Sequence, residues 1–251
     1  MDKAERQKTR RRFYVSRDCI REGFAVLPSE QAHHLRNVLR LKTGDEVELF
    51  DGEGGGYCGL VEAHGDAVFV RELKRTNFEQ LQSRLVLAAA LIKSAKFEFI
   101  LQKATELGVA EIIPLYTRFC EIEIPRHKIE ARLERWRRIL QEASKQSRRF
   151  VSPVLRPPIE FSDFLGLAEL SCCSKFLFYE KAEAPWSFQA KLANDIVLCV
   201  GPEGGWDVRE VEQAKEAGFD IKSLGPWVLR AETAAIASLS IVQTHVLSNA
   251  P

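Results

Sequence analysis

The chain has 251 residues, 45% of them hydrophobic, and a formal charge of +1 at pH 7. This length and composition can bury a sizeable core and predict two domains, while the balanced charge gives no argument for binding a polyanion through the whole surface. No apolar run is long enough to span a bilayer, the charged N-terminus is unlike a secretory signal, and the six cysteines show no zinc-ligand spacing. We therefore expect a cytoplasmic protein with no membrane contact and no metal.

Short strands dominate the first third of the chain. Residues 1–10 are polar and basic and are predicted to be a disordered tail. A helix is expected from Ser29, as its N-cap, to about Leu39, with Val38 on its apolar side. The strands expected around it are 13–15, 24–27, 46–50, 57–62 and 67–73. Several short strands with one helix predict a small β-barrel over residues 11–75.

The pattern changes after a polar linker expected at 74–83. The expected strands are 85–92, 109–116, 176–179, 196–200 and 221–224, and the expected helices are 97–107, 129–148, 208–217 and 231–247. Asp207 is a suitable N-cap for the third helix, and Phe99 is expected in the core. Since strands and helices alternate, residues 84–249 are predicted to form a parallel sheet covered on both faces.

Two loops in this second region carry the most specific signal. Residues 201–206, Gly-Pro-Glu-Gly-Gly-Trp, follow one apolar strand, and residues 224–234, Leu-Gly-Pro-Trp-Val-Leu-Arg-Ala-Glu-Thr-Ala, follow another. Glycines let a backbone turn sharply and approach a ligand closely, and loops at the carboxyl ends of neighbouring strands bind the ligand of an open α/β sheet. Neither loop carries P-loop or G-x-G-x-x-G spacing, which disfavours a nucleotide hydrolase.

Together these loops resemble the C-terminal motifs of the SPOUT RNA methyltransferases. The resemblance to the ribosomal RNA small subunit methyltransferase E family covers most of the chain. Residues 11–15 are similar to its opening Arg-Arg-Phe-Phe-Val, residues 33–40 with 44–45 and 49–52 to its first-domain signature, and 102–109 to its first catalytic-domain motif. It implies a SPOUT-type parallel sheet with a trefoil knot and an N-terminal PUA-like β-barrel. It also implies a homodimer formed through the apolar last helix, and methylation of N3 of a uridine in 16S rRNA with S-adenosylmethionine (SAM) as cofactor.

The chain departs from this family at positions that affect charge. The family usually has Ser-Glu-Arg-Ser/Cys where residues 117–120 are Thr-Arg-Phe-Cys, and it commonly has Arg where this chain has Trp227. These changes move or remove charge near the face expected to contact RNA. They leave intact the glycine-rich backbone that would hold the cofactor.

The candidate site residues follow from the chemistry of methyl transfer, which depends on positioning. The residues expected to hold the cofactor are Gly201, Pro202, Glu203, Gly204, Gly205, Leu224, Gly225, Leu229, Arg230, Thr233 and Ala234. Because uridine N3 carries a proton, a general base or a stabilising cation is needed. The candidates are Arg12, Arg230 and Glu232, although Arg230 and Glu232 could instead pair with each other at the start of the last helix.

Two basic clusters predict local contacts with phosphates. Residues 1–21 carry eight Lys/Arg against three acids, and residues 126–149 carry nine against three; a solvated face is the alternative for each. The residues expected to contact RNA are Arg11, Arg12, His34, Arg36, Lys93, Lys96 and Arg149. The expected partner is 16S rRNA or the small ribosomal subunit. The alternative function is a non-catalytic RNA-binding protein in ribosome assembly, which need not bind SAM tightly.

Overall fold

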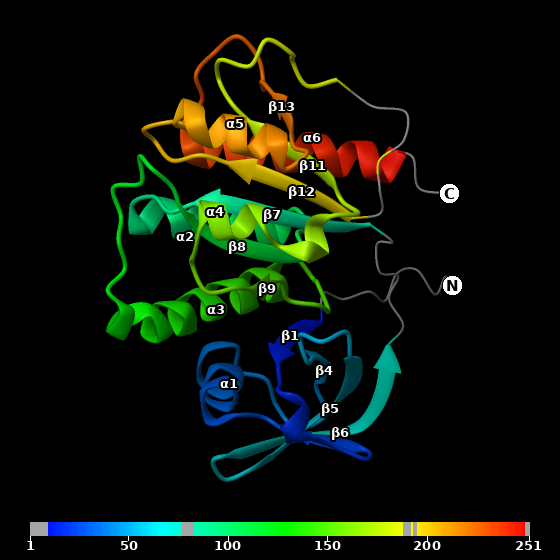
Figure 1. Cartoon of the computed structure of the whole chain (residues 1–251). Helices are drawn as coiled ribbons and strands as arrows, with labels where there is room; N and C mark the ends of the chain where they lie inside the picture. Colours follow the sequence, from blue (N-terminus) through cyan, green and yellow to red (C-terminus); the bar gives the residue numbers. More distant parts are fainter. Residues whose placement is uncertain (1–9, 77–82, 188–191, 193–194, 249–251) are drawn as a thin grey trace. The chain divides into compact units, whose positions relative to one another are not determined.

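The computed structural model describes residues 10–76, 83–187, 192 and 195–248 (Figure 1). The chain divides into two compact units. Unit 1 comprises residues 1–80 and 144–152, and unit 2 comprises 81–143 and 153–251. This division differs from the predicted ranges 11–75 and 84–249, since a segment from the middle of the chain groups with unit 1. The predicted tail lies, except for its last residue, outside the described residues.

Unit 1 is built on a six-stranded sheet with the order β1-β4-β5-β6-β3-β2. The strands are β1 (Arg11–Tyr14), β2 (Ile20–Arg21), β3 (Phe24–Val26), β4 (Glu46–Phe50), β5 (Gly56–His64) and β6 (Ala67–Thr76). Neighbouring strands are antiparallel, except that β1 and β4 are parallel. Apolar side chains such as Phe13, Leu35 and Leu49 are fully buried in one core beneath this sheet. The β-rich N-terminal domain that the sequence predicted is therefore confirmed.

The helix of unit 1 differs from its prediction in three ways. It begins as α1 (Ser29–His33) and continues as a π-helix, η3 (His34–Val38). Pro28, not Ser29, occupies the N-cap position, and no side chain caps the helix. Val38 is 60% exposed, because a π turn holds an extra residue and shifts the side chains that follow it. Strand β6 also extends to Thr76, so the predicted linker starts later than expected, and residues 77–82 lie outside the described residues.

Unit 2 contains a sheet in which every pairing is parallel, with the order β10-β8-β7-β12-β11-β13 and β9 beside β8. Its strands are β7 (Arg84–Ala90), β8 (Glu111–Tyr116), β9 (Val154–Leu155), β10 (Ile159–Glu160), β11 (Ser174–Phe178), β12 (Asp195–Val200) and β13 (Asp220–Lys222). Its helices are α2 (Ser94–Glu106), α3 (Ile129–Gln146), α4 (Phe161–Leu165), α5 (Val208–Glu216) and α6 (Ala231–Ser248), with short 3-10 turns at η4 (Arg126–Lys128) and η5 (Ala168–Leu170). The last three residues of α3 group with unit 1.

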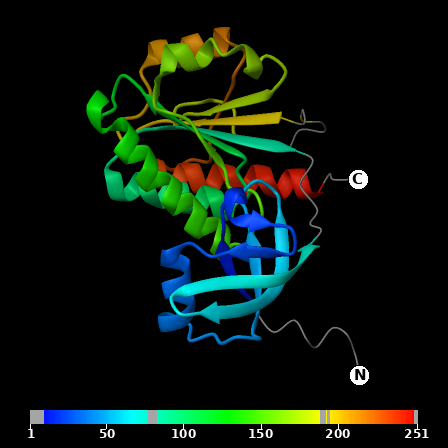
Figure 2. The ribbon, with the colours of Figure 1, turned by 90° about the horizontal axis from the view of Figure 1, so that it is seen from below.

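Helices cover both faces of this sheet, as predicted. Side chains from α2, α3 and α6 pack on one face and those from α4 and α5 on the other, and Figure 2 shows α2 and α6 running beneath the strands. Strand β7 illustrates the two-sided burial, because Leu85 and Leu87 belong to one core and Val86 and Ala88 to the other. The predicted mixed fold with a parallel sheet is confirmed, and the knot stays a prediction.

Local features of unit 2 test individual predictions. Asp207 is the N-cap of α5, as expected: its carboxylate accepts a hydrogen bond from the backbone of Arg209, and Glu210 completes a capping box. The prediction that Phe99 lies in the core is wrong, since its side chain is 43% exposed. It lies two residues beyond the fully buried Phe97 and therefore on the opposite side of α2.

Candidate functional site

A pocket of about 690 Å³ in unit 2 lies at the carboxyl ends of three strands. The loops that follow β11, β12 and β13 form it together with the first turn of α6. It is lined by Phe178, Tyr179, Glu180, Val200, Gly201, Pro202, Glu203, Gly204, Gly205, Trp206, Leu224, Gly225, Trp227, Val228, Leu229, Ala231 and Ala234. The expectation that two neighbouring strands carry the site needs correction, because β11 lies between β12 and β13 and pairs with both.

The glycines of the first loop bring its backbone close to other groups. A Cβ atom at Gly201 would lie 2.9 Å from the ring of Trp206, and one at Gly204 would lie 2.9 Å from Cβ of Phe119. The positive φ angles fall elsewhere, at Gly205 (75°) and Gly225 (136°). Gly201 and Gly204 therefore have to be glycine because of close packing, whereas Gly205 and Gly225 have to be glycine because of their positive φ. The lining thus combines glycine backbone with apolar side chains and two carboxylates, those of Glu180 and Glu203.

Trp206 anchors the glycine-rich loop to the sheet. Its side chain is buried, and its indole Nε1 donates a hydrogen bond to the carbonyl of Phe178 at 2.9 Å. Its ring also packs against Phe161 with a centroid separation of 5.0 Å. The loop is thus fixed at its far end before any ligand arrives, which lowers the ordering cost of binding.

A small group of charges connects the pocket with two helices. Lys96 on α2 lies with its Nζ 3.2 Å from Glu203 Oε1 and 3.9 Å from Glu232 Oε1. Glu232 is in the first turn of α6, and its Oε2 is buried with no hydrogen-bond partner. Lys96, expected to contact RNA, is thus engaged by carboxylates, and it is Lys96 rather than Arg230 that lies beside Glu232. Lys93 is exposed at the start of α2.

Nine of the eleven residues expected to hold the cofactor line this pocket. The two that do not are Arg230, which is exposed, and Thr233, which lies in the first turn of α6. The sequence prediction missed Tyr179 and Glu180, which come directly after β11. A signal was available, because 176–179 reads as a buried strand whose carboxyl end belongs to the same edge of the sheet.

Arg12 is held inside unit 1. The residue is 6% exposed; its guanidinium forms an ion pair with Glu48 at 2.9 Å, donates to the carbonyl of Arg149 at 3.2 Å and stacks on the rings of Phe50 and Phe150. Desolvation by burial lowers its pKa, while the Glu48 carboxylate opposes that shift. These surroundings favour a structural role over the predicted catalytic one.

The other residues expected to contact RNA in unit 1 differ in exposure. Arg11 is exposed, and Arg36 pairs with Asp66 at 3.2 Å. Burial lowers the pKa of Arg149 to about 10.

Within unit 1, a basic pocket of about 660 Å³ combines residues of both basic clusters and is lined by Arg10, Arg11, Arg12, His34, Leu39, Lys145, Gln146 and Arg148. This concave, cationic surface suits a phosphate group.

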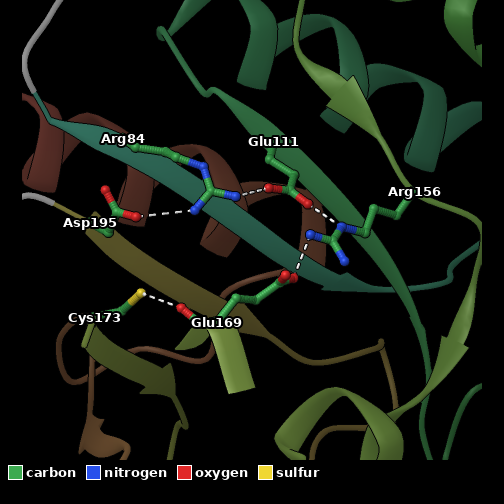
Figure 3. A network of polar contacts seen from close by, with 6 residues as sticks. All are labelled: Arg84, Glu111, Arg156, Glu169, Cys173 and Asp195. Atoms are coloured by element: carbon green, nitrogen blue, oxygen red, sulfur yellow. Dashed lines mark hydrogen bonds and ion pairs between the residues drawn. The ribbon is translucent and has the colours of Figure 1, made fainter. Parts of the chain in front are cut away.

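A second charge network in unit 2 lies at the amino ends of the strands, away from the pocket. Figure 3 shows the buried Glu111 between the guanidinium groups of Arg84 and Arg156, with Arg84 also 3.1 Å from Asp195. Arg84, Glu111 and Asp195 are the first residues of β7, β8 and β12, and Arg156 directly follows the two-residue strand β9. Since all pairings are parallel, this network joins the edge of the sheet opposite the pocket and takes no part in it.

No helix among the described residues has the length and apolar character needed to cross a membrane. The same part of the chain shows no group of three or more His, Cys, Asp or Glu arranged to hold a metal ion. The described cysteines are all free thiols, and burial raises the pKa of Cys199 well above its usual value.

Comparison with known families defines the class of protein. The RNA methyltransferase domain family matches residues 79–243, and the RNA methyltransferase PUA domain family matches residues 27–72. The methyltransferase match covers the parallel sheet of unit 2 and the glycine-lined pocket at the carboxyl ends of its strands. The chain is therefore an RNA methyltransferase.

Similar proteins narrow this class to one family. The Ribosomal RNA small subunit methyltransferase E of Synechocystis sp. is 34% identical over 91% of this chain and 76% of that protein, and the one of Bacillus subtilis is 30% identical over 88% and 91%. The crystal structure of the Neisseria gonorrhoeae enzyme of this name, bound to S-adenosyl methionine, has 29% identity and a TM-score of 0.85 over 94% of this chain and 97% of that one. The structure of a methyltransferase from Legionella pneumophila with bound SAM has 32% sequence identity and a TM-score of 0.82, again over 94% of this chain and 97% of that one. The chain belongs to the ribosomal RNA small subunit methyltransferase E family.

Proposed function

We propose that this protein transfers a methyl group from SAM to N3 of a uridine in the rRNA of the small ribosomal subunit. The observation that carries the proposal is the pocket at the carboxyl edge of the unit 2 sheet, where glycines expose the backbone beside apolar side chains. Two similar structures hold SAM, and the family name supplies the RNA. When bound, SAM supplies a methyl group on a sulfonium, which makes the methyl carbon electrophilic.

The cofactor is proposed to lie in the slot between the two glycine-containing loops. Gly201 and Gly204 line it and, lacking side chains, let their loop pack against Trp206 and Phe119. The apolar side chains of Leu224, Leu229 and Ala234 suit the faces of an adenine ring. These backbone and apolar groups orient the ligand without neutralising its charge. Positioning of this kind is the main requirement of an in-line methyl transfer.

Removal of the uridine N3 proton is proposed to depend on the charges beside the pocket. Glu232 is the candidate base, since it has a buried carboxylate oxygen without a donor, and Arg230 is the candidate cation for a uridine anion. Lys96 would hold Glu232 and Glu203 in place. The basic pocket of unit 1 is proposed to bind RNA phosphates through Arg11, His34 and neighbouring cations.

We further propose that the protein acts in the cytoplasm as a homodimer. Helix α6 is apolar around most of its circumference, and Ile236, Ala237 and Ile241 are only partly buried in the single chain. A helix of this kind needs cover on more than one side. A second copy of the chain would provide it.

The proposed reaction is tested by mass spectrometry of small-subunit rRNA from a strain that lacks the gene. One N3-methyluridine should disappear, return with the wild-type gene, and fail to return with Glu232→Gln. An unchanged modification pattern would refute the reaction. Calorimetry with purified protein separates the alternative function, because a non-catalytic RNA-binding protein has no need of tight SAM binding.

A further inference from the structure

We propose that Glu180 makes the pocket select the cationic cofactor SAM over its demethylated product, S-adenosylhomocysteine (SAH). This inference rests on the proposed function, since it assumes that SAM occupies the pocket. It adds a residue and a property that the sequence motifs do not assign: a charged side chain that distinguishes the loaded cofactor from the spent one.

The charges that line the pocket are all negative. Among its lining residues the ionisable acids are Glu180 and Glu203, and no lysine, arginine or histidine lines it. The two carboxylates are not equivalent. Glu203 is compensated by Lys96, whose Nζ lies 3.2 Å away, whereas Glu180 has no ion pair or hydrogen bond to any side chain within the described part of unit 2. One carboxylate therefore stays uncompensated at the pocket wall.

The position of Glu180 follows from the sheet order and from a glycine. Glu180 lies two residues after the end of β11, the strand between β12 and β13, so its loop lies between the two glycine-containing loops. A Cβ atom at Gly205 would lie 3.4 Å from Glu180 Oε1, so the carboxylate rests against the backbone of the glycine-rich loop. Gly205 has a φ of 75°, and a larger residue there would be strained and would also crowd this carboxylate.

The chemistry of the two ligands makes this carboxylate selective. SAM and SAH share the adenosine, the amino group and the carboxylate, and they differ in the methyl group and in the positive charge on sulfur. An uncompensated negative charge thus attracts SAM more strongly than SAH, and the attraction is lost once the sulfur is a neutral thioether. For a solvent-accessible pair of unit charges this difference is on the order of a fivefold change in Kd. The selectivity favours loading of the cofactor and release of the product.

The experiment is calorimetric titration of the full-length protein with SAM and, separately, with SAH. The variants are Glu180→Gln, which removes the charge and keeps the shape, and Glu180→Asp, which keeps the charge. Glu183→Gln is the matched control, because Glu183 is exposed three residues further on and does not line the pocket. We expect Glu180→Gln to weaken SAM binding about fivefold and to leave SAH binding nearly unchanged. Glu180→Asp and Glu183→Gln should keep the wild-type preference for SAM, and added salt should reduce it.

Two outcomes overturn the inference. Equal losses for SAM and SAH in Glu180→Gln would mean that the carboxylate binds a group common to both, such as a ribose hydroxyl. Unchanged affinity for both would mean that it does not sense the cofactor. Either result leaves the proposed function standing, because the wild-type protein still binds SAM. Failure of the wild-type protein to bind SAM would instead overturn the proposed function and this inference with it. Thermal unfolding of each variant verifies that it is folded.

Discussion

Replacing Gly204 by valine is the most direct test of the cofactor loop. The Cβ atom would lie 2.9 Å from Cβ of Phe119 and 3.3 Å from the Phe119 carbonyl oxygen. Neither atom is at the flexible end of a side chain, so the backbone of one loop has to shift. Backbone strain does not contribute, because the positive φ in this loop occurs at Gly205 and not at Gly204. The reason for the effect is therefore steric.

The size of the effect follows from the cost of forcing a side chain into occupied space. Overpacking of this kind costs about 1–3 kcal/mol. The free protein can relieve it by moving the exposed loop, but the bound state has to restore the loop, so the cost falls on binding. This corresponds to a SAM Kd that is weaker by about 5- to 150-fold. The core is not involved, since Gly204 is exposed, and the variant should stay folded.

Calorimetry measures the SAM affinity of Gly204→Val, and thermal unfolding verifies its fold. Gly166→Ala is the matched control, because its new Cβ would meet only ordinary contacts, the nearest at 3.5 Å. Adding Phe119→Gly to Gly204→Val removes the closest clash and should restore part of the affinity. A Gly204→Val protein with the affinity of wild type would refute the reasoning and remove this loop from the site.

Three further predictions concern other parts of the chain. Arg12→Ala should lower stability by about 3–5 kcal/mol, because it leaves Glu48 buried without its closest partner. The variant should also methylate RNA poorly and bind SAM normally. Wild-type stability of Arg12→Ala in urea would contradict the predicted loss of stability. Glu111→Gln should cost about 1–3 kcal/mol, since two partly exposed arginines lose a buried carboxylate; an unchanged denaturation midpoint would argue against this. Sedimentation velocity at micromolar concentration should show a dimer, and a monomer would contradict the proposed assembly.

Much of unit 2 could be predicted because its strands are buried on both faces. Runs such as Ile196 to Val200 are continuously apolar, and all five strands predicted there exist within a few residues of the expected bounds. The order of the strands could not be predicted in the same way. Local sequence does not state that β11 inserts between β12 and β13, and for this reason Glu180 escaped notice although the strand before it was expected.

The shortest helices and strands could not be predicted from hydrophobic periodicity. Helix α4 has five residues and β9 and β10 have two each, too few to display a repeat of 3.6 or 2. The π-helical η3 shows a different failure, because the sequence pattern predicts an ordinary helix and the extra residue in the turn places Val38 in solvent. Both errors concern geometry set by tertiary packing.

The residues at the amino ends of the unit 2 strands stabilise the sheet, whereas those at the carboxyl ends form the pocket. At the amino edge, paired charges such as Arg84 with Glu111 fix the starts of several strands, and each charge has a partner there (Figure 3). At the carboxyl edge, glycines replace side chains and a carboxylate is left uncompensated. Glycines lower stability because they lose the most conformational freedom on folding, and their concentration at this edge is typical of a binding site. One sheet can contain both the stabilising charge network and the binding pocket because its rigid strands hold the pocket loops in position.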